Sequence, residues 1–341
     1  MGGINETVSL VDTMRGKVQD VSAPSLYMNI AVTGGTGFIG RHLASRLLAD
    51  GHVVHSLSTG NTPIPATLQA YPSFHSWEGN VSDQTTLDSL ISSVDTVFHL
   101  AGINHERGAK TFDRVHVHGT RQIVAAAEAA SIDRIILTSY LRARPDCGSR
   151  YHETKWHAEE LCRESTIPSC IVKPAAVYGP EDQFVTGLSR WLRTFPIIPT
   201  VGLREPPLAP VAVDDVVDVL IKFLQWDTDT TVALTGPTSL TMRKIVRIIL
   251  TALNQRGVGI PAPVFFHRLS APVLQRLFSP PLVTPAGVTM LAEGMVEPAP
   301  ADVCDALPEG LEPTRPFDVQ SVKAIASATE RYALNDMQKP W

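Results

Sequence analysis

The sequence predicts an α/β protein with a doubly wound parallel sheet and a smaller C-terminal lobe. Two observations carry this prediction. A glycine-rich turn joins an apolar run to a helical run in "VTGGTGFIGRHLASRLLADGH", residues 32–52. Strand-like and helix-like segments then alternate as far as "SCIVKPAAVYG", residues 169–179. Such alternation indicates a parallel sheet that is covered by helices on both faces.

Length, charge and cysteine usage set the bounds. The chain of 341 residues is long enough for about two structural units, and its net charge of −5 gives no indication of nucleic-acid binding. The N-terminus lacks the basic start and apolar core of a signal peptide, and no apolar run reaches the ~18 residues that span a bilayer. Four cysteines without a CxxC spacing indicate reduced thiols. We therefore expect a cytoplasmic protein, with residues 1–27 as an N-terminal extension.

The glycines of the first turn are spaced for a diphosphate. Residues 29–33 are typical of a buried strand, and apolar residues recur at helical spacing from Phe38 onward. Between them, Gly34 permits a tight turn, Gly37 lets a diphosphate approach the backbone, and Gly40 lets the helix pack on the strand. The free N–H groups and the dipole of the helix N-terminus favour an anion there. This arrangement predicts dinucleotide binding by a Rossmann-type sheet.

Further segments are typical of strands and helices of the same domain. The strand segments are 52–58, 72–79, 95–102, 133–139 and 169–179, and the helical stretches include 120–130 and 151–165. Ligands of such sheets lie at the carboxyl ends of the strands, here 34–40, 101–102, Ser139 and 174–179. We expect a dinucleotide-binding domain over 28–240, with 181–210 contributing to the substrate lobe, and the rest of that lobe over 241–341.

The chain resembles the extended or atypical short-chain dehydrogenase/reductases. The motifs "TGGTGFIG", "HLAG", "YHETK", "KPAAVYGP" and "PVAVDDVVDVL" occur in the order and spacing of that family. The likeness is greatest to the branch of epimerase/dehydratase-like proteins that includes a nucleotide-binding accessory subunit of respiratory complex I, and it is strong from Met28 to Lys222. The resemblance implies a nicotinamide cofactor. The matching positions that would contact it are Gly34, Gly37, Phe38, Ile39, Gly40, Leu100, Ala101, Gly102, Tyr151, Lys155, Pro174 and Val177.

Tyr151 and Lys155 form the YxxxK pattern of the family. On a helix, residues four apart share one face. A neighbouring ammonium favours the phenolate, so we expect Lys155 to lower the pKa of Tyr151 and to let it exchange a proton with a substrate oxygen. The resemblance implies that Lys155 also holds the nicotinamide ribose.

The third catalytic position is open between two residues. The family usually places Ser or Thr just beyond the fifth strand, where "RIILTSY" offers Ser139 or Tyr140. Ser139 supplies the usual hydroxyl, whereas the alignment on Tyr140 leaves it missing. The family commonly has Asn where this chain has His116. Three arginines of the following loop could meet an anionic substrate, although a solvated loop is the simpler interpretation. They are Arg142, Arg144 and Arg150.

The second strand indicates which nicotinamide cofactor is used. NAD-binding sheets carry Asp or Glu about 20 residues after the glycines, on the adenine ribose. The segment "HSLSTGNT" has no acid, and Ser58, Thr59, Asn61 or Arg41 could donate hydrogen bonds to a 2′-phosphate. We therefore favour NADP and keep NAD as the alternative. The segment "EGNVSD" resembles the adenine-side turn of the family, which places Asn80 and Val81 beside the adenine.

The C-terminal half contains two notable segments. Residues 211–226 are predicted to form a helix that is capped near Asp214 or Asp215. Residues 260–290 are apolar and broken by prolines. They could line a hydrophobic pocket or touch a membrane surface, although ordinary lobe core is the simpler interpretation. We expect His267 to be a hydrogen-bonded core residue, and the histidines show no metal-ligand cluster, so we predict no metal site.

Together these features predict an NAD(P)-dependent oxidoreductase that acts on a carbonyl or alcohol carbon. Two alternatives remain: a cofactor-binding scaffold subunit or redox sensor without turnover, and a sugar-nucleotide epimerase. A sugar-nucleotide dehydratase needs a carboxylate just after the active-site hydroxyl, which "TSYLRAR" lacks. We expect a small-molecule substrate, a monomer or homodimer, and neither nucleic-acid nor membrane partners.

Overall fold

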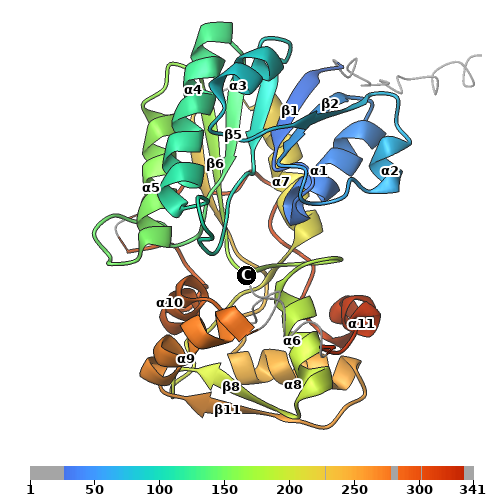
Figure 1. Cartoon of the computed structure of the whole chain (residues 1–341), viewed down its shortest axis with the longest axis vertical. Coiled ribbons are helices and arrows are strands. Elements are labelled where there is room, and N and C mark those ends of the chain that lie inside the picture. The colour runs from blue at the N-terminus through green and yellow to red at the C-terminus, as the bar shows by residue number, and fades with distance from the viewer. Residues whose placement is uncertain (1–26, 227, 278–282, 301, 334–341) are drawn as a thin grey trace, which may run out of the picture.

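The computed structural model describes residues 27–226, 228–277, 283–300 and 302–333 (Figure 1). Its upper part is one parallel sheet of seven strands in the order β10-β6-β5-β4-β1-β2-β3. The strands are β1 Asn29–Thr33, β2 Val53–Ser58, β3 Phe74–Glu78, β4 Thr96–His99, β5 Arg134–Thr138, β6 Ser169–Pro174 and β10 Thr230–Leu234. The predicted doubly wound α/β fold is therefore confirmed. Of the predicted N-terminal extension, only Tyr27 lies within the described residues.

Helices cover both faces of this sheet. The main helices are α1 Phe38–Ala49 and α7 Val213–Lys222 on one face, and α3 Gln84–Ile91, α4 Gly119–Ala130 and α5 Arg150–Arg163 on the other. Shorter turns are α2 Ala66–Gln69, the π-helical η1 Asp113–His118 and the 3-10 helix η2 Phe223–Gln225. The alternation along β1 explains the two layers, because Ile30 and Val32 pack with Leu43 of α1 whereas Ala31 packs with Ile123 of α4.

The strand order places a crevice at the carboxyl end of β1. The chain moves outward from β1 through β2 to β3, and then crosses back to β4 on the other side of β1. The connections after β1 and β4 therefore diverge, and this topological switch point is where open α/β sheets bind ligands. The glycine turn after β1 and the "HLAG" segment after β4 both lie there.

The lower part is a separate layer of helices over a small sheet. Its elements are α6 Phe184–Thr194, β8 Ile197–Val201, α8 Met242–Ala252, β11 Val258–Ala262, α9 Val264–Leu277, α10 Pro285–Glu293 and α11 Val319–Ala328. The chain enters this lobe at α6, returns to the upper sheet through α7 and β10, and enters the lobe again at α8 (Figure 1). None of the described helices has the length and apolar character that a membrane span requires.

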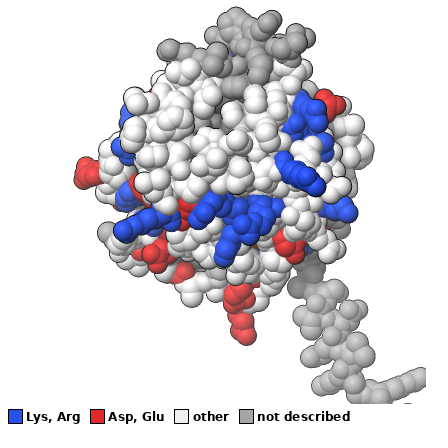
Figure 2. All heavy atoms as spheres, turned by 90° about the horizontal axis from the view of Figure 1, so that it is seen from below, with Lys and Arg blue, Asp and Glu red and all other residues white. Residues whose placement is uncertain are grey.

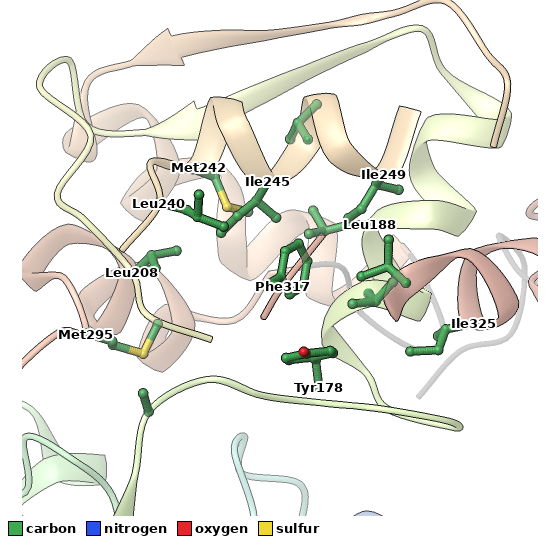
Figure 3. Packing of buried hydrophobic residues seen from close by; sticks show 14 of the residues in the cluster. Tyr178, Leu188, Leu208, Leu240, Met242, Ile245, Ile249, Met295, Phe317 and Ile325 are labelled. Carbon is green, nitrogen blue, oxygen red and sulfur yellow. The ribbon is translucent and has the colours of Figure 1, made fainter. Parts of the chain in front are cut away.

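The lobe has its own apolar core. Ile245 and Ile249 of α8 face Leu188 of α6, and Phe317 closes the cluster from the segment before α11 (Figure 3). All four side chains are buried. This core is built from segments that are far apart in the sequence, so it fixes α6 and α8 against each other.

Three sequence expectations are corrected. The single strand predicted over 169–179 is two strands, because the chain leaves the large sheet after β6 and forms β7 Val177–Tyr178, which pairs with β9 Val211–Ala212. The predicted cap of α7 at Asp214 or Asp215 is wrong. The N-cap is Ala212, and Asp215 within the first turn pairs with Arg315 instead. Strand β10, at the sheet edge, was not among the predicted strands.

Candidate functional site

The glycine turn has the backbone conformation that its sequence predicts. Gly34 has φ +73°, and a Cβ at this residue would lie 2.9 Å from the Ala101 backbone nitrogen. A Cβ on Gly40 would collide with the Gly34 carbonyl, which explains why this helix residue has no side chain. Gly37 is the N-cap of α1, and no side chain caps the helix there. The first N–H groups of α1 therefore remain available to an anion.

A cleft of about 1150 Å³ opens at the carboxyl ends of the strands, and we call it the glycine cleft. Thirteen residues that the sequence assigned to the site line it: Gly34, Gly37, Phe38, Ile39, Gly40, Asn61, Leu100, Gly102, Ser139, Tyr151, Lys155, Pro174 and Val177. These residues come from the ends of β1, β4, β5 and β6 or the loops after them, from the loop after β2, from β7, and from α1 and α5. The structure thus brings together side chains and backbone that the sequence separates by more than a hundred residues.

Residues that the sequence reasoning missed also line the glycine cleft. They are Ile103, Asn104, His105, Arg107, Gly108, Ala109 and Lys110 after β4, together with Thr138, Gln183 and Phe184. The only available signal was their position after a predicted strand end. Arg107 and Lys110 give this loop a positive charge, which suits a diphosphate.

Ala101 and Arg41 lie outside the lining of the glycine cleft. The backbone of Ala101 packs on Gly34, and its N–H donates to the Thr33 hydroxyl at 3.4 Å. The Arg41 guanidinium donates to the Thr36 carbonyl at 2.8 Å and forms an ion pair with Glu181. Arg41 therefore has an acidic partner already at the position where the sequence suggested a phosphate.

The three predicted adenine-side residues also lie outside that lining. The Ser58 carbonyl accepts from the Gly79 N–H at 2.9 Å, which joins the ends of β2 and β3. The Asn80 side-chain oxygen accepts from the Ser82 N–H at 3.1 Å. Val81 is buried in the core beside α4. The predicted contacts of Asn80 and Val81 with adenine, and of Ser58 with a 2′-phosphate, remain predictions.

Tyr151 and Lys155 lie on one face of α5, as the spacing predicts. The Lys155 ammonium donates to the Thr138 carbonyl at 3.1 Å, and a Cβ on Gly102 would lie 3.3 Å from it. Burial lowers the pKa of Lys155 to about 8. Burial also raises the pKa of the Tyr151 phenol above its ordinary value. The expected lowering of the Tyr151 pKa by Lys155 is thus not seen in this structure.

Tyr140, rather than Ser139, faces Tyr151. The rings of Tyr140 and Tyr151 lie edge to face with centroids 5.5 Å apart. The Tyr140 hydroxyl is buried and has no hydrogen-bond partner among the described residues. The Ser139 hydroxyl instead donates to Glu159, which forms a buried ion pair with Lys173 at 2.9 Å. Ser139 therefore belongs to a buried polar network, and its catalytic role remains a prediction that the geometry does not favour.

His116 supports the site from the π-helical turn η1. Its ring nitrogens contact the Thr154 hydroxyl at 3.0 Å and the backbone of Ile103 at 3.1 Å. Burial, together with the nearby Lys155, holds the pKa of His116 well below its usual value, so the ring is neutral. A neutral imidazole can both donate and accept hydrogen bonds, as an amide does. It can therefore replace the usual Asn as a link between the β4 loop and α5.

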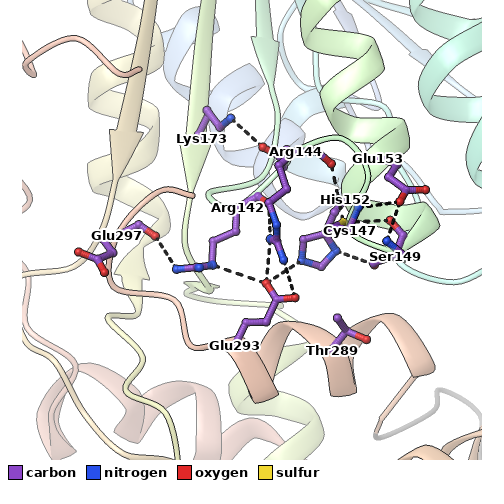
Figure 4. A network of polar contacts seen from close by, with 12 residues as sticks. Arg142, Arg144, Cys147, Ser149, His152, Glu153, Lys173, Thr289, Glu293 and Glu297 are labelled. Carbon is purple, nitrogen blue, oxygen red and sulfur yellow. Dashed lines mark hydrogen bonds and ion pairs between the residues drawn. The ribbon is translucent and has the colours of Figure 1, made fainter. Parts of the chain in front are cut away.

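The arginines after β5 connect the two lobes. Arg144 forms two hydrogen bonds with Glu293 of α10, at 2.8 and 2.9 Å, and Arg142 lies 3.5 Å from the same carboxylate (Figure 4). His152 of α5 approaches Glu293 at 3.6 Å. Arg150 pairs with Asp113. The expectation of a solvated loop is thus wrong for Arg142 and Arg144, which tie α10 to the Rossmann domain.

A second cavity, of about 590 Å³, adjoins the glycine cleft, and we call it the apolar cavity. The lower lobe supplies most of its walls, with Leu188, Trp191, Ile198, Val201, Met242, Phe266, Leu274, Met290 and Leu291 among the lining residues. Tyr140 and Tyr151 line both spaces. His267 also lines it, and its buried ring contacts the Thr200 carbonyl at 3.2 Å, as predicted for a hydrogen-bonded core histidine.

The residues of the glycine cleft fit a nicotinamide dinucleotide. The uncapped α1 N-terminus and the glycine turn suit the diphosphate. The Thr138 hydroxyl is buried without a hydrogen-bond partner among the described residues, and it lines the cleft near Lys155. Buried polar groups normally have a partner, so this hydroxyl indicates room for a polar ligand group.

Comparisons with known proteins agree with this geometry. Residues 30–232 match the model of the NAD dependent epimerase/dehydratase family. The chain is 32% identical to a ceramide reductase of Caulobacter vibrioides over 57% of its own length and 60% of that protein. It is 25% identical to the 40 kDa subunit of NADH-ubiquinone oxidoreductase from Neurospora crassa, over 79% of this chain and 75% of that subunit.

A solved structure shares the fold. The UDP-glucuronic acid 4-epimerase of Bacillus cereus, in complex with NAD, superposes with a TM-score of 0.60. The match covers 69% of this chain and 88% of the epimerase, at 22% identity. At this identity the likeness shows the fold alone.

Proposed function

Because the chain belongs to the NAD dependent epimerase/dehydratase family, we propose that it is an NAD(P)-dependent oxidoreductase for a substrate with a long apolar body. The reaction transfers a hydride to or from a carbonyl or alcohol carbon. One observation carries the proposal: the apolar cavity meets the glycine cleft at Tyr151. An apolar substrate in the cavity would present its polar end to the phenol.

Each residue has a stated task in the proposed reaction. The bound nicotinamide would supply or accept the hydride. In the direction of reduction, a hydride would add to the carbonyl carbon while Tyr151 donates its proton to the carbonyl oxygen. The phenolate is then reprotonated from solvent. Lys155 stays charged below its pKa of about 8 and stabilises the transient phenolate.

The residues that line the apolar cavity favour a lipid-like substrate over a sugar nucleotide. Its walls are mostly aliphatic and aromatic, whereas a nucleotide sugar needs polar partners along its whole length. The name of one relative, ceramide reductase, also refers to a lipid. We therefore place the sugar-nucleotide epimerase alternative below the oxidoreductase.

Cofactor binding without turnover is the second candidate function. Its support is the pairing of Ser139 with Glu159, which removes the usual serine hydroxyl from Tyr151. The likeness to a subunit of NADH-ubiquinone oxidoreductase is consistent with a scaffold or sensor.

The cofactor choice depends on an acid that β3 supplies. Ser58 at the end of β2 is in register with Glu78, and the Glu78 carboxylate lies 2.5 Å from where a Cβ on Gly60 would stand. A carboxylate beside the β2 loop repels a 2′-phosphate and suits a ribose hydroxyl. With Arg41 already paired to Glu181, we propose that NAD binds more tightly than NADP, which reverses the expectation from the β2 sequence alone.

Equilibrium titration tests the cofactor choice. We expect tighter binding of NADH than of NADPH to the wild type, and a shift toward NADPH in Glu78→Gln, which removes the charge and keeps the shape. Asp88→Gln in α3 serves as a charge-matched control. Tighter binding of NADPH to the wild type would contradict the assignment to Glu78.

A substrate screen tests the oxidoreductase. Long-chain and sterol-like ketones and alcohols would be followed by nicotinamide absorbance, with short-chain analogues for comparison. Turnover by Tyr151→Phe should fall at least about 100-fold, the low end of what a general acid contributes. NADH affinity should stay unchanged, because the phenol is aimed at the substrate. If Tyr151→Phe turns the substrate over at the wild-type rate, Tyr151 is excluded as the proton donor. Tight cofactor binding without any turnover would favour the scaffold or sensor.

A further inference from the structure

Helix α9 exposes a row of large apolar side chains. Phe265, Phe266, Leu269 and Val273 are 66%, 47%, 74% and 55% exposed. Positions 265, 269 and 273 are four residues apart, so they lie on one face of the helix. Single exposed apolar residues are ordinary, but a contiguous row of this kind marks an interaction surface. We call these four residues the α9 face.

The opposite side of α9 is buried and carries smaller or polar side chains. Ala271 is fully buried and packs with Val201 and Val288, and His267 is buried against the Thr200 carbonyl. The helix thus turns a methyl group and an imidazole inward and its largest apolar groups outward. A surface helix that covers only its own protein has the reverse pattern.

The chain around α9 is basic. Residues 230–292 contain no Asp or Glu, so all 34 acidic residues of the chain lie elsewhere. The same stretch contains six cations, Arg243, Lys244, Arg247, Arg256, Arg268 and Arg276, of which Arg243 is paired with Glu205 from outside the stretch. Arg268 of α9 and Lys244 and Arg247 of α8 are exposed. Seen from below, the molecule has a broad uncharged area bordered on one side by a band of Lys and Arg side chains, with several Asp and Glu side chains beside that band (Figure 2).

The α9 face is continuous with the apolar cavity. Phe266 belongs to the exposed row and also lines the cavity. Leu274, about two turns further along α9, lines the cavity as well. An apolar molecule that enters the cavity beside α9 would therefore meet apolar walls as far as Tyr151.

We propose that the α9 face docks on the surface of a membrane that contains anionic lipids. Phe265 and Leu269 insert among the acyl chains, and Arg268 with the neighbouring cations contacts the headgroups. Apolar side chains beside an acid-free basic stretch match the two attractions of such a surface, burial in the interface and charge. Docking places the mouth of the apolar cavity at the lipid. This proposal departs from the expectation, drawn from the sequence, that the protein has no membrane partner.

Vesicle co-sedimentation of the full chain, without cofactor or substrate, tests the proposal. Vesicles of phosphatidylcholine alone are compared with vesicles of equal parts phosphatidylcholine and phosphatidylglycerol. We expect at least about ten-fold tighter binding to the anionic vesicles, with the advantage lost at high salt. The double variant Phe265→Ser/Leu269→Ser should bind at least about ten-fold more weakly than the wild type. Neither residue lines the cavity, so its NADH affinity should not change.

A matched double variant controls for the loss of exposed apolar groups. Tyr71→Ser/Val303→Ser removes side chains that are 38% and 86% exposed on other parts of the molecule, and its binding should equal that of the wild type. Three results would overturn the proposal. They are no binding of the wild type to anionic vesicles, equal loss in both double variants, or a wild-type dimer that only Phe265→Ser/Leu269→Ser dissociates. The last result would assign the α9 face to a second copy of the chain. None of them bears on turnover, so the proposed function is tested separately.

Discussion

The glycine cleft and the apolar cavity share Tyr140 and Tyr151 as lining residues, yet they are built in different ways. The turn of the glycine cleft is backbone, held by residues that are close in sequence, such as Gly37, whose N–H donates to the Gly34 carbonyl at 2.9 Å. The apolar cavity is made of side chains from segments between residues 104 and 295. The glycine turn therefore depends on contacts between residues that are close in sequence. The apolar cavity depends instead on how the two lobes pack together.

The largest effect should come from a change within the glycine turn. Gly37→Val places a branched side chain where the diphosphate would contact the N-terminus of α1. Losing two hydrogen bonds to a charged group should weaken NADH binding about 100-fold. Fluorescence titration measures this, after circular dichroism has shown that the variant folds.

Gly37→Ala is the graded control for this position. Its Cβ would meet only the Gly34 carbonyl, at 3.0 Å, so the loss should be much smaller than for valine. Equal NADH affinities of Gly37→Val and the wild type would contradict cofactor binding at the glycine turn, because the cofactor would then lie elsewhere.

A change in the apolar cavity should act on the substrate alone. Met290→Trp fills space beside α10, and kcat/KM for a long apolar substrate should fall about ten-fold, while a short analogue and NADH are little affected. Steady-state kinetics with both substrates gives the ratio of kcat/KM for the long substrate to kcat/KM for the short one. Val303→Trp adds the same ring at a site that is 86% exposed and should change neither value. An equal loss for long and short substrates would show that the cavity does not hold the apolar body.

The smallest effect concerns stability and pH at the junction of the two spaces. Burial lowers the pKa of Lys155 from 10.5 to about 8, so between these values the unfolded chain binds more protons than the folded one. The free energy of unfolding of the wild type should therefore rise with pH relative to Lys155→Met, by about 1 kcal/mol per pH unit at most. Denaturant unfolding at pH 7 to 10 measures the difference between the two proteins. A difference that does not change with pH would mean that Lys155 is not desolvated.

Some properties of this protein follow from neighbouring residues in the sequence. The turn at Gly34, the helix that starts after Gly37, and the pairing of Tyr151 with Lys155 on one face of α5 could all be predicted, because backbone sterics and helical spacing act over a few residues. The parallel sheet also followed from the alternating pattern, since hydrophobic periodicity fixes the type of each element.

Other properties were decided only when the chain was folded. The β5 sequence could not show that Ser139 turns to Glu159 while Tyr140 meets Tyr151, because the choice depends on a buried ion pair with Lys173. The acid at the β2 loop comes from β3, through strand pairing. The apolar cavity and the exposed α9 face depend on which sides of scattered helices pack together. Long-range packing is not encoded in any local pattern, so tertiary structure alone determined the substrate end.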